Sequence, residues 1–154
     1  MKNKKGFTLI ELLAVIVILA LLVAVAIPAV TKYLNSSRKG VFADNAAAAI
    51  SAVRNQTIID GITGTQTYDL GKINELLEKK LIKSPWASYK EASVTVTENN
   101  GVYAYKIFLT DGQHCIGKKN GTTITEVEEK DVTADAVKPT SSDNPCGTYS
   151  ENNE

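Results

Sequence analysis

Apolar residues follow one another almost without interruption near the start of the chain. Between Leu12 and Val30 the sequence has no charged residue and consists mainly of Leu, Ile, Val and Ala. As a helix, this run would measure roughly 28 Å, which is close to the thickness of the hydrocarbon core of a bilayer. The pattern therefore predicts a helix that can cross a membrane.

The same helix is predicted to continue beyond Val30 with a single apolar face. Apolar residues recur there at helical spacing between charged ones, and Asp60-Gly61 supplies a stop, so the helix should end at about Ile59. The recurring apolar residues are Tyr33, Leu34, Val41, Phe42, Ala46, Ala49, Ile50 and Val53. The Gly- and Thr-rich segment 62–67 that follows is predicted to be a loop.

The residues after the long helix are predicted to form a small globular domain, the head. Leu and Ile at helical spacing predict a second helix over 69–82, which Ser84-Pro85 would end. Alternating residues predict strands over 92–98 and 102–110, joined by a tight turn, and two further short strands with their turns between 114 and 127. We predict an α+β fold in which an antiparallel sheet of three or four strands packs on the C-terminal half of the long helix.

Three lysines, Lys2, Lys4 and Lys5, precede the apolar run with no acidic residue among them. Positive charge collects on the cytoplasmic side of a membrane span, so the N-terminus should lie inside and the bulk of the chain outside. A signal peptide is the competing interpretation. Its apolar region would be shorter, whereas this run leads directly into an amphipathic helix.

Glu11 is an unexpected residue in a membrane anchor. A carboxylate one turn inside an apolar segment costs several kcal/mol unless it finds a partner, so it is a functional candidate. It lies in the sequence Lys5-Gly6-Phe7-Thr8-Leu9-Ile10-Glu11-Leu12-Leu13. This sequence resembles the type III signal sequence of type IV prepilins, in particular those of class IVa.

The resemblance implies a defined processing event. A prepilin peptidase that is also a methyltransferase would cut between Gly6 and Phe7 and N-methylate Phe7, and Glu11 would act in subunit assembly. The freed amine of Phe7 lies four residues before Glu11. In a bundle of staggered helices, the amine of an incoming subunit could therefore neutralise Glu11 of a neighbour. The alternative is a glutamate that reaches the interface of an uncleaved anchor.

The resemblance also implies a division of the chain. A leader, 1–6, would precede a transmembrane and filament-core helix over 7–30. The amphipathic half of the same helix would occupy 31–60, and a globular head 61–154. The subunit would lie in the cytoplasmic membrane before assembly and in an extracellular pilus afterwards.

The partners that the resemblance implies are those of a pilus. The subunit would form a helical homo-oligomer with minor pilins, built by an assembly ATPase and a membrane platform protein, for adhesion, twitching motility, biofilm formation or DNA uptake. No cofactor is implied. A pseudopilin of a type II secretion or competence machine shares the N-terminal motif and is the alternative, and an uncleaved single-pass adhesin or sensor is a third hypothesis.

Pro28 lies inside the predicted helix and removes a backbone donor, so a kink is expected there. In the pilin family the region equivalent to 20–28 is often unwound in the assembled filament. Unwinding would let the filament lengthen under tension without separation of its subunits. A simple kink is the alternative.

The two cysteines, Cys115 and Cys146, lie far beyond the apolar run. Metal binding needs more ligands at closer spacing, and the one histidine, His114, is alone, so no metal site is indicated. A disulfide is favoured over two free thiols if the head lies outside the cytoplasm. It would resemble the disulfide that bounds the C-terminal loop of many pilins.

Charge and composition narrow the functions further. The chain of 154 residues has seventeen basic and seventeen acidic residues, and removal of the three leader lysines leaves fourteen basic ones, so a nucleic-acid-binding surface is not predicted. No catalytic motif accompanies His114, so no enzyme is predicted. Richness in Lys, Asn, Ile and Thr suggests a Gram-positive source, such as a clostridium.

Acidic residues are frequent near the C-terminus. Major pseudopilins tend to hold calcium in this loop, and a calcium site therefore stays open beside the alternative of a solvated acidic face. The acidic residues concerned are Glu126, Glu128, Glu129, Asp131, Asp135 and Asp143.

Overall fold

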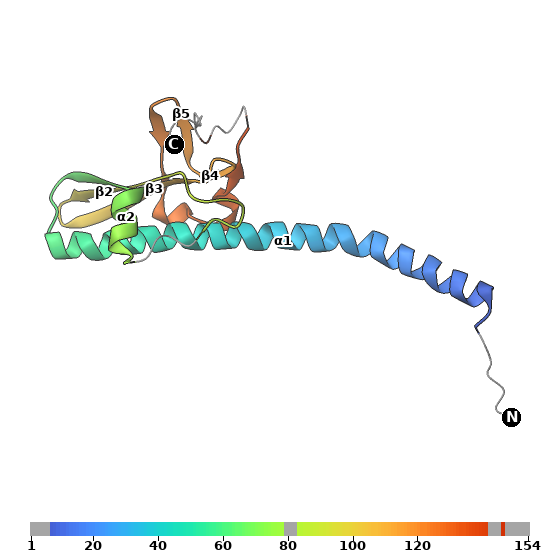
Figure 1. Ribbon diagram of the computed structural model, residues 1–154. Helices are drawn as coiled ribbons and strands as arrows, with labels where there is room; N and C mark the ends of the chain where they lie inside the picture. The colour runs from blue at the N-terminus through green and yellow to red at the C-terminus, as the bar shows by residue number, and fades with distance from the viewer. Residues whose placement is uncertain (1–6, 79–82, 142–145, 147–154) are drawn as a thin grey trace. The chain divides into compact units, whose positions relative to one another are not determined.

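One long helix begins the described part of the chain. The computed structural model describes residues 7–78, 83–141 and 146; the predicted leader 1–6, with Gly6, lies outside these ranges. Helix α1 extends over Leu9–Asp60 (Figure 1). It ends within a residue of the predicted stop, because Gly61 adopts a φ of 61° and donates its N–H to the carbonyl oxygen of Thr57 at 3.0 Å.

The chain forms two compact units that divide between Ser37 and Arg38, within α1. All described side chains of the first unit are exposed. In the second unit, α1 buries one face, which is the amphipathic face that the spacing predicted. The buried residues are Phe42, Ala43, Asn45, Ala46, Ala49, Ile50, Val53 and Thr57.

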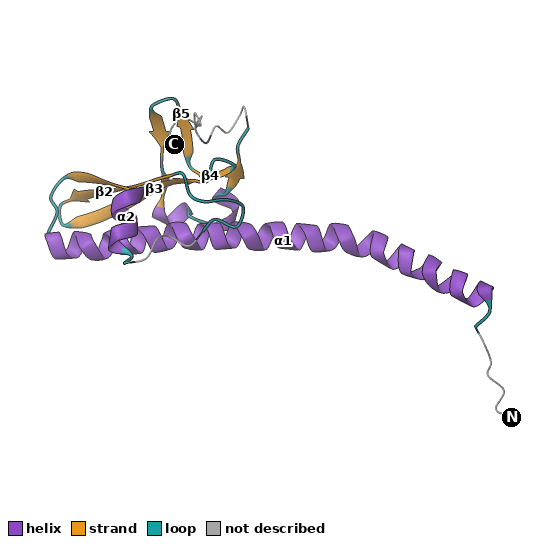
Figure 2. Cartoon of the chain, in the orientation of Figure 1, coloured by secondary structure: helices purple, strands orange, loops and turns teal. Residues whose placement is uncertain are grey.

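An antiparallel sheet packs on this buried face, which confirms the predicted α+β fold (Figure 2). The order of its strands is β1-β2-β3-β4-β8, and β7 also pairs with β3. The strands are β1 (Thr65–Asp69), β2 (Glu91–Asn99), β3 (Val102–Thr110), β4 (His114–Ile116), β7 (Val127–Glu128) and β8 (Lys138–Pro139). A second, two-stranded sheet consists of β5 (Lys118–Asn120) and β6 (Thr123–Thr125), and two 3-10 turns are η1 (Glu129–Asp131) and η2 (Ala134–Ala136).

The hairpin of β2 and β3 is the centre of the sheet and was predicted correctly. Asn100 and Gly101 both have positive φ, 52° and 80°, as a two-residue turn of the primed type requires. The turn sets the register, which pairs Val94 with Ile107 and Val96 with Tyr105. These side chains are buried on the face of the sheet that meets α1.

Arg54 of α1 ties the helix to η1. Its guanidinium donates to Glu129 and lies over the ring of Tyr105, 4.9 Å from the ring centroid. The hydrogen bond with Glu129 raises the pKa of Arg54. The pair is partly exposed, so we expect it to contribute to orientation more than to stability.

The second helix is shorter than predicted. Helix α2 extends over Leu70–Leu76, and its N-cap Asp69 accepts a hydrogen bond from the N–H of Lys72 at 2.8 Å. Glu78 has a φ of 53°, in the left-handed region, so the helix stops before it. The prediction of a helix up to residue 82 was therefore wrong, and residues 79–82 lie outside the described ranges.

The head contains more strands than predicted, since the larger sheet has six strands and three or four were expected. Residues 65–69, at the end of the predicted loop, form β1 because the backbone pairs with β2, and the hydroxyls of Thr67 and Thr95 meet across the pair at 2.9 Å. Between 114 and 127, where two short strands were predicted, the structure contains β4, β5 and β6, and β5 pairs with β6.

A small second cluster lies on the other face of the sheet, under the β5–β6 hairpin. Phe108, Cys115 and Cys146 are fully buried in it, and Ile124 packs against them. Gly117 leads into the hairpin with a φ of 86°, and a Cβ atom there would lie 2.6 Å from the carbonyl oxygen of Thr125. Only glycine therefore fits at this bend.

Candidate functional site

The N-terminus of α1 holds Glu11 in a specific local arrangement. The carbonyl oxygen of Thr8 accepts the first helical hydrogen bond, from the N–H of Leu12 at 3.2 Å, so Thr8 is the N-cap. The N–H and the hydroxyl of Thr8 both donate to Oε2 of Glu11 at 2.8 Å, and the N–H of Glu11 donates to the Thr8 hydroxyl at 3.3 Å. This reciprocal pattern is a capping box.

The capping box gives the carboxylate a partner within its own chain. It satisfies two N–H groups that the helix cannot satisfy itself, and it places a negative charge at the positive end of the helix dipole. Among the described residues, no hydrogen bond is made to the second oxygen, Oε1 of Glu11. The arrangement thus orients the carboxylate and leaves one oxygen for another partner.

Thr8 is a further residue of the candidate site, and no role was predicted for it from sequence. The signal was present, because Thr8 and Glu11 form the pattern Thr-x-x-Glu directly before an apolar run. Phe7, which the resemblance marked for methylation, is described and is 91% exposed. Gly6, on the other side of the expected cleavage bond, lies outside the described residues.

Within the described part of the chain, no other segment covers the apolar residues after Glu11. Their large side chains are half or more exposed from Leu12 to Val30. Among the described residues, α1 is the one helix whose length and composition would allow it to cross a membrane. An apolar surface of this size marks a site of contact with lipid or protein.

Pro28 lies within α1, and the segment 20–28 is helical. Proline has no N–H, so the carbonyl of Ala24 lacks its usual donor. Three residues later, the hydroxyl of Thr31 donates to the carbonyl oxygen of Ile27 at 3.0 Å. The predicted unwinding concerns the assembled filament and stays a prediction.

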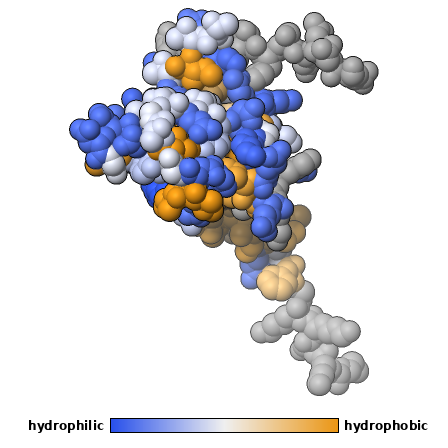
Figure 3. All heavy atoms as spheres, turned by 90° about the vertical axis from the view of Figure 1, so that its left-hand side faces the viewer, coloured by the Kyte–Doolittle hydropathy of each residue, from blue (hydrophilic) through white to orange (hydrophobic). Residues whose placement is uncertain are grey.

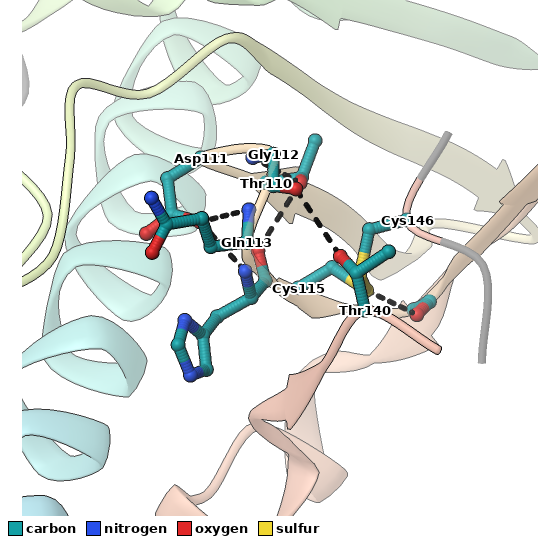
Figure 4. Close-up of a disulfide and its surroundings, with 9 residues drawn as sticks. Thr110, Asp111, Gly112, Gln113, Cys115, Thr140 and Cys146 are labelled. Carbon is teal, nitrogen blue, oxygen red and sulfur yellow. Dashed lines mark hydrogen bonds between the residues drawn. A yellow bond between two sulfur atoms is a disulfide. The ribbon is translucent and has the colours of Figure 1, made fainter. Parts of the chain in front are cut away.

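In the second unit, a disulfide joins Cys115 of β4 to Cys146, with Cα atoms 5.6 Å apart (Figure 4). Both cysteines are buried. Close to the bond, the N–H of Thr140 donates to the carbonyl oxygen of Gln113 at 2.7 Å. The bond therefore holds Cys146 against β4.

His114 makes packing and hydrogen-bond contacts within the head. Its ring stacks on Trp86 at a centroid distance of 3.8 Å, and its backbone N–H donates to Oδ1 of Asp111 at 2.7 Å. Burial lowers the pKa of its imidazole. The contacts are those of a residue that packs a loop against a strand.

Three of the C-terminal acidic residues make contacts of their own. Glu126 accepts hydrogen bonds from Ser93 and Thr95 at 2.7 and 2.9 Å, Glu128 pairs with Lys130, and Glu129 pairs with Arg54. Within the described ranges, no three His, Cys, Asp or Glu residues are grouped so that they could hold a metal ion. Asp143 lies outside those ranges.

The N-terminal features also match a known family. Residues 1–27 match the family model of the prokaryotic N-terminal methylation motif. This methylation motif contains Gly6, Phe7, Thr8 and Glu11 together with most of the apolar run. It supports a type IV pilin-like prepilin, a group of structural subunits that includes pilins and pseudopilins.

The methylation motif implies processing by a prepilin peptidase and assembly into a pilus-like system. The exposed apolar helix is consistent with anchoring in a membrane before that assembly. No solved structure matches the chain.

Proposed function

We propose that this protein is the structural subunit of a type IV pilus. The observation that carries the proposal is an exposed apolar helix that begins, inside the methylation motif, with Glu11 held by Thr8. Lipid can cover such a helix, and so can the same helix of other copies, because packed helices bury one another's apolar faces.

The first step is processing. Cleavage between Gly6 and Phe7 removes residues 1–6, with Lys2, Lys4 and Lys5, and frees an amine that is methylated on Phe7. The N–H of Thr8 remains an amide after this cut, since Phe7 becomes the terminal residue. The capping box therefore survives processing.

The second step is assembly. The amine of an incoming subunit approaches the free oxygen of Glu11 in a subunit already in the filament. When the amine and the carboxylate pair, neither charge is left unpaired in an apolar environment. The two groups meet at only one axial offset of the two helices. Glu11 thus sets the register of the filament, and Thr8 keeps its carboxylate in place.

In this proposal the chain stands first in the cytoplasmic membrane with its N-terminus inside, and then in an extracellular filament. An assembly ATPase, a membrane platform protein and minor pilins act with it. Adhesion, twitching motility, biofilm formation or DNA uptake are the tasks of such filaments.

The test separates the charge of Glu11 from its capping role. Glu11→Gln keeps a side chain that can form a capping box but removes the charge. We expect normal cleavage and about a tenfold or larger loss of sheared surface filaments, because a lost interaction of about 1.4 kcal/mol already corresponds to a factor of ten. Intact mass measures cleavage, and immunoblots of the sheared fraction measure assembly.

Thr8→Ala is the companion variant, since it removes the cap and keeps the charge. We expect a loss of about 1 kcal/mol at the start of the helix and a smaller loss of filaments, with Thr8→Ser close to the unchanged chain. Thr31→Ala is a control on the same helix. Normal filaments from Glu11→Gln would contradict the charge mechanism, and a purified chain that still begins at Met1 would contradict processing. Short cell-bound structures in place of surface filaments would favour a pseudopilin.

A further inference from the structure

Strand β1 (Thr65–Asp69) is an edge of the larger sheet without the usual protection. Within the described residues β2 is its one partner strand, and β8 (Lys138–Pro139) forms the opposite edge. The unpaired backbone groups of a sheet edge can pair with another chain, and proteins commonly block such an edge with a short strand, a lysine or a proline. β8 combines these three protections. β1 has five residues and contains neither lysine nor proline.

The register of the sheet shows which backbone groups of β1 face the open edge. The N–H of Glu98 in β2 donates to the carbonyl oxygen of Gly64 at 2.7 Å. Along an antiparallel pair, alternate residues direct their N–H and C=O groups to the same neighbour. Gly64 and Gln66 therefore direct theirs to β2, whereas Thr65 and Thr67 direct theirs to the open edge.

This edge is accessible. Thr65, Gln66 and Thr67 are exposed, whereas Tyr68 is buried in the core. β1 begins five residues after α1 ends, and the face of the second unit at the end of α1 is mainly hydrophilic or of intermediate hydropathy, with small and separate apolar patches (Figure 3). A partner on this side therefore meets hydrogen-bonding groups more than a continuous apolar surface.

We propose that β1 pairs with the β1 of a second copy of the chain, antiparallel and centred on Gln66. In this register Thr65 of each copy lies opposite Thr67 of the other, and each such pair exchanges both of its backbone hydrogen bonds. The hydroxyl of Thr65 already donates to Thr97 at 3.3 Å, and the hydroxyls of Thr67 and Thr95 meet at 2.9 Å. The pairing places the threonine rows of the two copies side by side on one face of a continuous sheet.

The strand is suited to pair with its own copy because the paired positions are uncharged. Identical charges that face each other across a strand pair are destabilising, and Thr65, Gln66 and Thr67 bring none. The two Gln66 side chains face each other on the symmetry axis, and each amide has both a donor and an acceptor for the other. The pairing ends before Asp69, whose side chain caps α2.

The contact has two-fold symmetry, so it closes as a pair of chains. The axis stands on the sheet, and it therefore reverses the direction of the α1 segment that packs along the same sheet. The inference rests on the proposed function at this point, because subunits of one filament all point the same way. The contact thus joins subunits of two filaments that run in opposite directions, such as filaments of facing cells. One short contact is weak, and its repetition along both filaments multiplies the binding.

The first experiment uses the full-length chain in detergent. In the proposed register, the Cα atoms of the two Gln66 residues lie about 4.5 Å apart, within the range that a disulfide spans. Gln66→Cys should therefore give a covalent dimer on mild oxidation. Thr65→Cys is the matched control, since it lies on the same strand, and its two copies would be roughly 7–8 Å apart. Cys115 and Cys146 are buried and bonded to each other, so they do not interfere.

We expect about tenfold more dimer from Gln66→Cys than from Thr65→Cys. Equal amounts from the two variants, or no dimer from Gln66→Cys, would overturn the proposed pairing.

The second experiment uses filaments. Thr67→Pro removes an N–H that faces the open edge, and it leaves the backbone hydrogen bonds between β1 and β2 in place. The amount of sheared filament should stay the same, while the fraction of filaments found in bundles by electron microscopy should fall about tenfold. Thr67→Ser keeps both the N–H and the hydroxyl and should form bundles normally. Unchanged bundles in Thr67→Pro would contradict the contact; if this variant yields less cleaved chain, the cysteine variants decide.

The outcomes also separate this contact from the pilus function. Filaments that form no bundles, together with a Gln66→Cys chain that gives no dimer, would refute the β1 contact and leave the pilus subunit in place. Dimers of Gln66→Cys from a chain that is never found in a polymer would support the contact between copies and refute the pilus subunit.

Discussion

At the scale of single residues, the one histidine of the chain, His114, stacks on its one tryptophan, Trp86. The rings are tilted by 14°, and Trp86 also contacts Phe42 of α1 at 6.1 Å between centroids. Burial lowers the pKa of His114 below its ordinary value of 6.5; Asp111 opposes this shift, and Lys39 adds to it. The charged imidazolium is therefore less favourable in the folded chain than in the unfolded one.

We expect the free energy of unfolding to fall as the pH is lowered through 6.5. The unfolded chain binds the proton first, so stability is lost from that pH down to the pKa of the folded state and then levels off. Denaturant titrations of the full-length chain in detergent, between about pH 8 and pH 5, measure this loss. Trp86 fluorescence reports the protonation of its neighbour at the same time.

His114→Gln is the matched variant, because glutamine keeps a polar side chain and does not titrate. Its stability should stay nearly constant over the same range of pH. An equal slope in both chains would assign the pH dependence to other groups and would remove His114 from the explanation.

At the scale of elements, one disulfide joins Cys146 to Cys115 of β4. The bond closes a sequence separation of 31 residues, and its cysteines form the small cluster with Phe108 and Ile124. We expect Cys115→Ala/Cys146→Ala to lower the free energy of unfolding by about 3 to 4 kcal/mol, mainly because the unfolded chain gains freedom. Urea unfolding of the full-length chain measures the change, and a loss below about 1 kcal/mol would show that the hairpin packing holds the segment without the bond.

The elements that could be predicted from sequence are those fixed by local pattern. Helix α1 follows from its apolar spacing and the Asp60-Gly61 stop, and the β2–β3 hairpin follows from alternation and the Asn100-Gly101 turn. Strand β1 could not be predicted in this way, because its five residues are mostly polar and become a strand only by pairing with β2. The end of α2 depends on a single residue in a left-handed conformation.

In the candidate site, too, some features could be predicted from a local sequence pattern and others needed the structure. Phe7 and Glu11 could be found from sequence because the motif is contiguous. Thr8 could have been found from its spacing to Glu11, yet the orientation of the carboxylate and its free oxygen needed the structure. The class of the pilin and its source stay predictions.

At the scale of the whole molecule, the proposed function places one helix in two surroundings, first lipid and then a filament. The first unit exposes every described side chain, so its apolar part needs a cover of lipid or of other protein. The second unit has a core of its own between α1 and the sheet. In the proposed function, transfer from lipid to filament changes the surroundings of the first unit while the second can keep its fold.

Pro28 offers a mechanical test of the filament. If the segment 20–28 changes from helix to extended chain, its nine residues lengthen each subunit by about 16 Å. Pro28→Ala returns an N–H to the carbonyl of Ala24 and favours the helix by about 3 kcal/mol, so we expect filaments that still assemble but need a higher force to extend. Optical-tweezers measurements on single filaments give this force, with Ala29→Ser as a control that keeps the proline. Equal force–extension curves for Pro28→Ala and the unchanged chain would place the extensible element outside this segment.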